Sequence, residues 1–152
     1  MRIALGADHA GVVLKHEVKR LLDTLGAAYQ DFGTDSDASV DYPDFAERVA
    51  RAVVEGAFDR GILICGTGIG MAIAANKVAG VRAAPASDVE TARLSREHND
   101  ANVLALGARV LSTERALQVV RAFLETPFLG GRHGRRVAKI EAIERHGAAP
   151  AS

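Results

Sequence analysis

The first part of the chain combines a short apolar run with a helical pattern of apolar positions. The run Arg2–Ala7 is followed by leucines and valines that recur every three or four residues, from Leu14 through Val18 to Leu25, and Gly26 closes the pattern. A run of this length is typical of a strand, and the three-to-four spacing is typical of a helix with one buried face. The segment therefore predicts one strand followed by one helix.

The same alternation continues to the end of the chain. Further strands are expected at Ala27–Phe32, Gly61–Cys65, Val81–Ala86 and Val103–Leu106. The run Gly61–Cys65 is apolar throughout, which is typical of a central parallel strand covered on both faces. Five further helices are expected. The first runs from Pro43 to just before Gly56, the second follows the glycine-rich loop Gly66–Gly70, and the third runs from a capping box of Ser87 and Glu90 to His98. The fourth lies between Ser112 and Pro127, and the last follows Arg136.

Five strands separated by helices predict an α/β fold, a three-layer Rossmann-like sandwich with a five-stranded parallel sheet, because each parallel connection needs a crossover. Ligands of such sheets bind beyond the carboxyl ends of the strands. If the loops after the strands Arg2–Ala7 and Gly61–Cys65 form one site, these two strands must be neighbours. The strand Ala27–Phe32 would then lie outside the first.

Composition narrows the class of protein. With 152 residues, 48% of them apolar, the chain can bury one core, so we expect a single domain over residues 1–146 and a disordered tail over residues 147–152. Lys plus Arg and Asp plus Glu are equal at 19 each, which argues against a nucleic-acid or membrane partner. No signal or membrane-spanning segment is evident, so the protein is expected in the cytoplasm. A single cysteine predicts neither a disulfide nor a zinc site.

The loop Gly66–Gly70 presents several backbone N–H groups at a predicted helix N-terminus, where negative charge is favoured. A dinucleotide-binding GxGxxG motif would need glycine at Met71, and a Walker A motif would need Gly-Lys-Ser/Thr, so neither is present. The loop is either a tight turn between strand and helix or an anion site. Sequence pattern alone does not separate these two interpretations.

Cys65 is the last residue before this loop, where N–H groups can stabilise a thiolate that accepts a proton. An isolated cysteine at a strand end is more often a core residue. A Cys-x5-Arg phosphatase would carry arginine at position 71, where this chain has Met71, and a redox pair would need a second cysteine. Cys65 is therefore either a core residue or a proton-transferring base.

Other polar residues stand at element ends. Asp8 and His9 follow the first strand, as an acid/base pair or as a helix cap with a polar neighbour. His98 and Asn99 end a helix that returns to the opposite edge of the sheet from Cys65, so a catalytic His98 would serve a partner subunit's site. The alternative is a histidine that only stabilises a helix C-terminus.

Three arginines could bind phosphate. Arg109 follows the fifth strand, and Arg132 and Arg136 are one helical turn apart near the start of the last helix. Positive charge at a helix N-terminus is unfavourable unless an anion is bound there, and arginine forks suit phosphate oxygens. The alternative is a solvated basic segment.

The chain resembles the ribose-5-phosphate isomerase type B family, which includes galactose-6-phosphate and allose-6-phosphate isomerases. The resemblance rests on GADHAG from Gly6, DYP from Asp41, ICGTGIG from Ile64, AANK from Ala74, SREHND from Ser95 and GGRH from Gly130. These motifs follow in the family's order over nearly the whole chain. The resemblance implies a Rossmann-like sandwich, a homodimer with sites at the interface or a tetramer of such dimers, and no metal or other cofactor.

The resemblance also implies a role for each matching residue. Cys65 takes the place of the base that forms an enediolate, His98 that of the proton donor in ring opening, with Asp8 assisting, and Thr67 holds sugar oxygens. The expected substrate contacts are the loop residues Gly66, Gly68, Ile69 and Gly70, the sugar-site residues Tyr42 and Asn99, and the phosphate-site residues His9, Arg109, Arg132 and Arg136. A branch of the family with a glutamate base differs from this chain, which has Ala74 and Ala75 in that region.

The sequence thus predicts an aldose–ketose isomerase that interconverts D-ribose 5-phosphate and D-ribulose 5-phosphate by cysteine-based proton transfer. Two alternatives stay open. One is an isomerase of a six-carbon sugar phosphate, such as allose 6-phosphate or galactose 6-phosphate. The other is a non-catalytic sugar-phosphate-binding module, which predicts binding without turnover.

Overall fold

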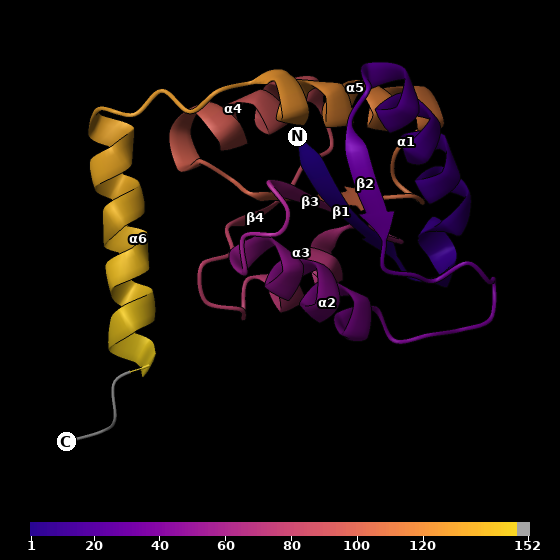
Figure 1. The fold of residues 1–152 in the computed structure, drawn as a ribbon, viewed down its shortest axis with the longest axis horizontal. Coiled ribbons are helices and arrows are strands. Elements are labelled where there is room, and N and C mark those ends of the chain that lie inside the picture. The colour runs from indigo at the N-terminus through magenta and orange to yellow at the C-terminus, as the bar shows by residue number, and fades with distance from the viewer. Residues whose placement is uncertain (149–152) are drawn as a thin grey trace.

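The computed structural model describes residues 1–148 and contains one five-stranded sheet (Figure 1). Its strands are β1 (Arg2–Ala7), β2 (Ala28–Asp31), β3 (Arg60–Cys65), β4 (Ala83–Pro85) and β5 (Val103–Gly107). They pair in parallel in the order β2-β1-β3-β5-β4. The predicted α/β class, the neighbouring positions of β1 and β3, and the outer position of β2 are confirmed.

The strand register brings three chain segments together at one edge. Ala7 at the end of β1 pairs with Ile64, and Cys65 at the end of β3 pairs with Gly107. Because these strands are parallel, the residues that follow them emerge side by side at the carboxyl edge of the sheet. The loops after β1, β3 and β5 therefore surround one place.

Helices cover both faces of the sheet. One layer holds α1 (Val12–Leu25), α4 (Val89–Asn99) and α5 (Thr113–Glu125), and the other holds α2 (Tyr42–Val54) and α3 (Ile69–Ala75) (Figure 1). A short 3-10 helix, η1 (His9–Gly11), precedes α1. The resulting three layers are those expected from the sequence.

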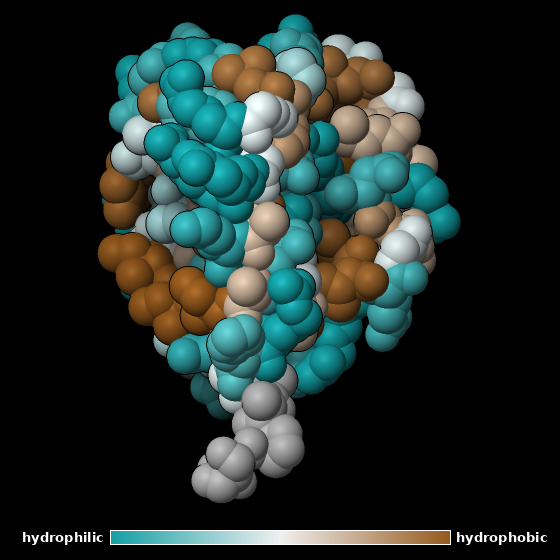
Figure 2. All heavy atoms as spheres, turned by 90° about the vertical axis from the view of Figure 1, so that its left-hand side faces the viewer, coloured by the Kyte–Doolittle hydropathy of each residue, from teal (hydrophilic) through white to brown (hydrophobic). Residues whose placement is uncertain are grey.

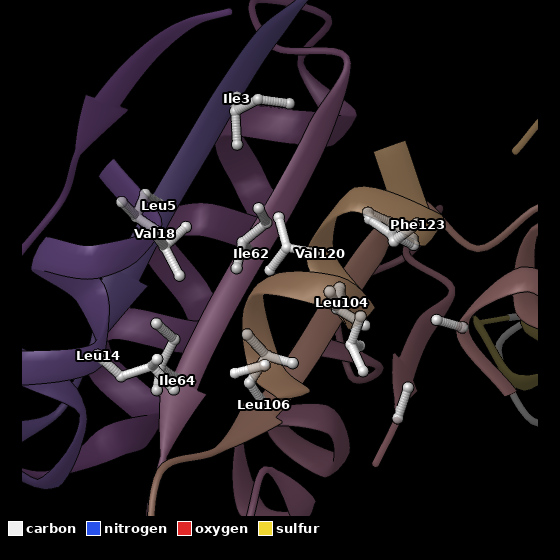
Figure 3. Close-up of a cluster of buried hydrophobic side chains, with 14 of the residues drawn as sticks. Ile3, Leu5, Leu14, Val18, Ile62, Ile64, Leu104, Leu106, Val120 and Phe123 are labelled. Carbon is white, nitrogen blue, oxygen red and sulfur yellow. The ribbon is translucent and has the colours of Figure 1, made fainter. Parts of the chain in front are cut away.

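Continuous apolar runs in the central strands and apolar stripes on the helices explain these layers. On the face shown in Figure 3, Ile62 and Leu104 of the sheet lie against Val120 and Phe123 of α5, and Leu14 of α1 packs beside Ile64. Ile62, Leu104 and Val120 are fully buried, and each such side chain contributes about 1.5–3 kcal/mol relative to an exposed position. Burial of the apolar stripes fixes both the register and the helix orientation.

The last helix, α6 (Arg132–Ala148), lies beside the sandwich and packs against α4 (Figure 1). Val137 is buried, but Ile140 and Ile143 are 47% and 72% exposed. Viewed from the side on which α6 lies, apolar surface flanks a largely polar ridge (Figure 2). Thus α6 leaves apolar side chains exposed to solvent.

Element boundaries differ from the predicted ones in several places. β4 begins at Ala83 rather than Val81, because the N–H of Val81 bonds the carbonyl of Val78 and that of Arg82 bonds the side chain of Asn102. The cap of α4 is Asp88 rather than Ser87, since the Asp88 carboxylate accepts the N–H of Thr91 at 2.7 Å.

The C-terminal helix also differs from expectation. α6 already includes Arg132, so the basic segment that was expected as a loop is the first turns of the helix. It continues through Gly147 and Ala148, the first two residues of the predicted tail. Residues 149–152, the rest of that tail, lie outside the described residues.

Candidate functional site

A hollow of about 430 Å³ lies at the carboxyl edge of the sheet, where the loops after β1, β3 and β5 meet. Its walls come from these loops and from the first turns of α2 and α3. The lining residues are Asp8, Tyr42, Cys65, Gly66, Thr67, Ile69, Gly70, Ile73 and Arg109. Most of the residues singled out from the sequence for this edge therefore share one open cavity.

Cys65 lies at the base of this hollow as the last residue of β3 and is 4% exposed. Its Sγ accepts a hydrogen bond from the backbone N–H of Gly68 at 3.2 Å. This contact holds the sulfur beside the start of the glycine-rich loop.

The glycine-rich loop is held against β5. Gly68 has a φ of +81°, in the left-handed region that favours glycine, and a Cβ on Gly107 would lie 2.6 Å from the Thr67 carbonyl oxygen. Two loop amides already have partners within the chain, since Gly68 N–H bonds Cys65 and Ile69 N–H bonds the Thr67 hydroxyl at 3.2 Å. These internal contacts hold the loop in place, and two of its N–H donors orient Cys65 and Thr67.

Asp8 and His9 stand beside this loop at the end of β1. Asp8 is 6% exposed, and its carboxylate accepts the N–H of Ala10 at 3.0 Å, so it caps η1 as well as lining the hollow. His9 Nδ1 accepts the backbone N–H of Val40 at 3.2 Å. An accepting Nδ1 carries no proton, so neutral His9 holds its proton on Nε2 and can donate from there.

Tyr42 and Arg109 close two sides of the hollow. The Tyr42 ring packs on Gly70, where a Cβ would lie 2.6 Å from the ring atoms. The Arg109 guanidinium lies over Gly66, with Nη1 3.2 Å from the place of a Cβ. Both glycines therefore allow a long side chain to lie close to the loop, and Arg109 brings a positive charge to the site.

The other predicted site residues gather at the opposite edge of the sheet. The helix α4 runs antiparallel to the strands, so His98 and Asn99 lie near the start of β5. The His98 ring stacks on His133 of α6 with centroids 4.2 Å apart and 10° between the planes. Arg132 and Arg136 belong to the same first turns of α6. Within one chain, these residues do not meet Cys65.

A buried ionic network fixes this second group. Arg96 is 4% exposed and donates to the carbonyls of Thr126 and Ala101 and to the Asp100 carboxylate, the last at 2.8 Å. Asp100 ends α4 with a φ of +47°. Burial, together with the charge of Arg96, lowers the pKa of nearby Arg60 to about 10. His98 is therefore presented from a helix end that is tied to the core.

His133 is a residue that the sequence reasoning missed as part of this group. It is 7% exposed and lies four residues before buried Val137, on the same face of α6. The four-residue spacing from Val137 could have predicted that His133 is buried, because residues at i and i+4 share a helix face. Sequence could not show that the same face meets His98.

Acidification is expected to destabilise the fold through His133. Burial, followed by the neighbouring His98 and Arg132, holds the pKa of His133 below its ordinary value of 6.5. The unfolded chain therefore binds a proton more readily, so this contribution to stability is complete above pH 6.5 and declines as the pH falls toward the pKa of the folded state. Urea unfolding between pH 5 and 8 measures it. A His133→Gln variant should show a shallower dependence on pH, and equal slopes for the two proteins would contradict the prediction.

Neither a membrane-spanning helix nor a metal-binding cluster is present in residues 1–148. No helix in this range combines the length and apolar composition needed to cross a bilayer. Within the same range, no group of three or more His, Cys, Asp or Glu side chains is arranged to hold a metal ion.

Comparison with known proteins gives extensive matches. The profile of the ribose/galactose isomerase family matches residues 3–140. Ribose-5-phosphate isomerase B of Escherichia coli strain K12 is 51% identical over 144 residues, which cover 95% of this chain and 97% of the relative.

Solved structures agree with this match. Ribose-5-phosphate isomerase B of Clostridium thermocellum is 53% identical with a TM-score of 0.95, covering 96% of this chain and 99% of its own. The enzyme from Mycoplasma genitalium, solved with bound ribulose-5-phosphate, is 44% identical with a TM-score of 0.91, covering 95% and 96%. The likeness includes both edges of the sheet and most of α6. The resemblance inferred from the motifs is confirmed, and the chain belongs to the ribose/galactose isomerase family.

Proposed function

We propose that this chain is an aldose–ketose isomerase that interconverts D-ribose 5-phosphate and D-ribulose 5-phosphate. The observation that carries the proposal is the Cys65 thiol at the base of a hollow that Asp8 and Arg109 also line. The relatives named as ribose-5-phosphate isomerase B, one of them with ribulose-5-phosphate bound, support this substrate. Membership of the family supports the reaction class.

The chemistry moves one proton between neighbouring carbons. After ring opening, the Cys65 thiolate takes the proton from C2 of the aldose, and the electron pair moves through the C1–C2 bond to the aldehyde oxygen. The resulting enediolate is stabilised by N–H groups of the loop and by Thr67. The thiol then returns the proton to C1, which gives the ketose after a proton moves from the C2 oxygen to the C1 oxygen. A base close to both carbons is the group that this step requires.

Ring opening and phosphate binding need the remaining residues. We assign His98 to protonation of the ring oxygen, with Asp8 assisting, and Asn99 to the sugar hydroxyls. The phosphate is assigned to Nε2–H of His9 and to the guanidinium groups of Arg109, Arg132 and Arg136. Arginine forks and a neutral imidazole donor suit phosphate oxygens.

A complete site requires two chains. Cys65, Asp8 and Tyr42 line a hollow at the carboxyl edge of the sheet, whereas His98 is at the amino edge with the start of α6. A two-fold dimer would bring the amino-edge group of one chain to the hollow of the other, at two equivalent sites. The exposed apolar side chains Ile140 and Ile143 on α6 supply surface for such an interface. We therefore propose a homodimer, which could pair further into a tetramer.

Turnover by the purified protein tests the function. Ribose 5-phosphate, allose 6-phosphate and galactose 6-phosphate are each supplied in the presence of EDTA, and ketose formation is measured. We expect conversion of ribose 5-phosphate with the highest kcat/KM, unaffected by EDTA. Preference for a six-carbon substrate would reassign the substrate within the family. Stabilisation by all three sugars without turnover would indicate a binding module.

Gly70→Ala is expected to raise the KM for ribose 5-phosphate because the new methyl group would displace the Tyr42 ring from the hollow. Tyr42 is 39% exposed and can turn outward, so the loss of stability should stay below about 1 kcal/mol. Steady-state kinetics and urea unfolding measure both effects. In a double-mutant cycle, adding Gly70→Ala to Tyr42→Ala should change KM little, because no ring remains to be displaced. Independent effects of the two changes would refute this account.

A further inference from the structure

Lys15 of α1 is a fully buried cation that the proposed mechanism does not use. Its side chain has 0% exposure, and its ammonium donates to Asp31 Oδ1 at 3.2 Å and to Asp35 Oδ1 at 2.8 Å. The carbonyl of Thr34 accepts a third hydrogen bond from it. An ammonium group has three protons, so these acceptors satisfy it fully, which is the condition for burying a charge.

Two of these three acceptors belong to the 32–41 loop, which joins β2 to α2. The start of this loop also continues the pairing with β1, since Thr34 N–H bonds the carbonyl of Ala7 at 2.8 Å and Ala7 N–H bonds that of Gly33 at 2.8 Å. The loop is therefore fixed beside the residue that precedes Asp8. Its middle, residues 35–39, is exposed.

The far end of the loop supports two predicted substrate contacts. Val40 N–H bonds Nδ1 of His9 at 3.2 Å, which keeps the His9 proton on Nε2, and Tyr42 begins the helix that follows the loop. The exposed middle cannot place Val40 by packing. Val40 itself is half-buried and packs against the core that α2 and α3 cover, and Lys15 holds the other end of the loop.

The charges around Lys15 also support a role in holding the 32–41 loop. The carboxylate of Asp31 is shared by Lys15 and Lys19, which lie one turn apart on α1, and Asp35 adds the second negative charge. Burial opposes ionisation of Asp31, but hydrogen bonds from Lys19 and Lys15 outweigh it and hold its pKa below the ordinary value. Lys19 contacts no acceptor of the loop, whereas Lys15 reaches two.

We propose that Lys15 is a positioning residue for substrate binding, which fixes the 32–41 loop so that Val40 orients His9 and Tyr42 closes the hollow. The proposal rests on the proposed function for the roles of His9 and Tyr42. It adds a residue outside the hollow whose removal should weaken binding of the sugar phosphate while leaving the chemical step intact.

Three variants test the proposal. Lys15→Met removes the charge but fills the buried position with an apolar side chain of similar length. Asp35→Ala removes an acceptor whose side chain is 70% exposed, so folding does not depend on this residue. Lys19→Met is the matched control, because it removes a cation from Asp31 without touching the loop. For each protein, KM and kcat for ribose 5-phosphate, amide hydrogen exchange over residues 36–41, and the ¹⁵N spectrum of the His9 ring are measured.

We expect Lys15→Met and Asp35→Ala to raise KM about tenfold with kcat changed by less than about twofold, the pattern of lost ground-state and transition-state binding. Exchange over residues 36–41 should become faster, and His9 should lose its single-tautomer signature. Lys19→Met should leave KM, the exchange over residues 36–41 and the His9 spectrum unchanged. The proposal would be overturned if Lys15→Met and Asp35→Ala both kept the wild-type KM, or if hydrogen exchange over residues 36–41 were unaltered, even if the melting temperature fell. If the wild-type protein has no turnover, the proposed function fails, while exchange and the His9 spectrum still decide whether Lys15 holds the loop.

Discussion

Cys65→Ala is expected to lower kcat for ribose 5-phosphate isomerisation by about 10²–10⁴-fold, the contribution typical of a positioned general base. The Sγ atom accepts the Gly68 N–H and lies in the hollow, and no other thiol is present in the chain to replace it. The alanine variant keeps the loop backbone but has no group that can take the C2 proton. Ketose formation by wild-type and variant proteins, compared at saturating substrate, measures the effect.

Cys65→Ser is the matched control for shape. Its hydroxyl can still accept the Gly68 N–H, but it ionises far less readily than a thiol, so kcat should remain low. Both variants should unfold in urea at nearly the wild-type midpoint, because a cysteine and a small replacement differ little in buried volume. Equal activity of wild type and Cys65→Ala would remove Cys65 from the mechanism and leave it as a core residue.

The fold was predictable because its determinants are local patterns. The buried run of β3 and the helical stripe of α1 each indicate one element, and the rules for parallel crossovers then limit the topology. Boundaries were less predictable, because they depend on single hydrogen bonds. Asp88 rather than Ser87 caps α4, and the side chain of Asn102 rather than a strand partner receives the N–H of Arg82.

The candidate site was predictable where strand ends define it. Cys65 and Asp8 stand directly after apolar runs, so the parallel topology is enough to bring them to one edge. Lys15 and His133 escaped prediction for a common reason. Each lies on a helix face where its polar partners come from a distant segment, the 32–41 loop for Lys15 and α4 for His133. A lysine in an amphipathic helix looks solvated until that segment is placed.

The separation of the proposed site into two groups has a functional consequence. The amino-edge group is held by the buried Arg96–Asp100 network, and the carboxyl-edge group by the glycine-rich loop. Neither support allows His98 to move along the length of the strands to the carboxyl edge within its own chain. If both His98 and Cys65 take part in catalysis, association of two chains is the remaining way to bring them together.

Mixing two inactive variants is therefore expected to restore activity. Cys65→Ala and His98→Ala homodimers should each retain less than about one hundredth of wild-type kcat, because each site lacks one proton-transfer group. A mixed dimer contains one site with both changes and one site with neither. Random association makes about half of the dimers mixed, so the recovered activity should be about one quarter of wild type. Co-expression with two different tags and tandem purification isolates the mixed dimer, which has one intact site of two and should therefore show about half of the wild-type activity.

A pair of changes within the same edge supplies the control. Asp8→Asn keeps an acceptor for the Ala10 N–H, so the cap of η1 survives, but the variant lacks the carboxylate. Mixed dimers of Cys65→Ala with Asp8→Asn have no intact site, since both residues belong to the same hollow, and should recover nothing. If mixed Cys65→Ala and His98→Ala dimers were isolated and stayed as inactive as their parents, His98 would act beside its own chain's Cys65 or outside catalysis, and the two-chain site would be wrong.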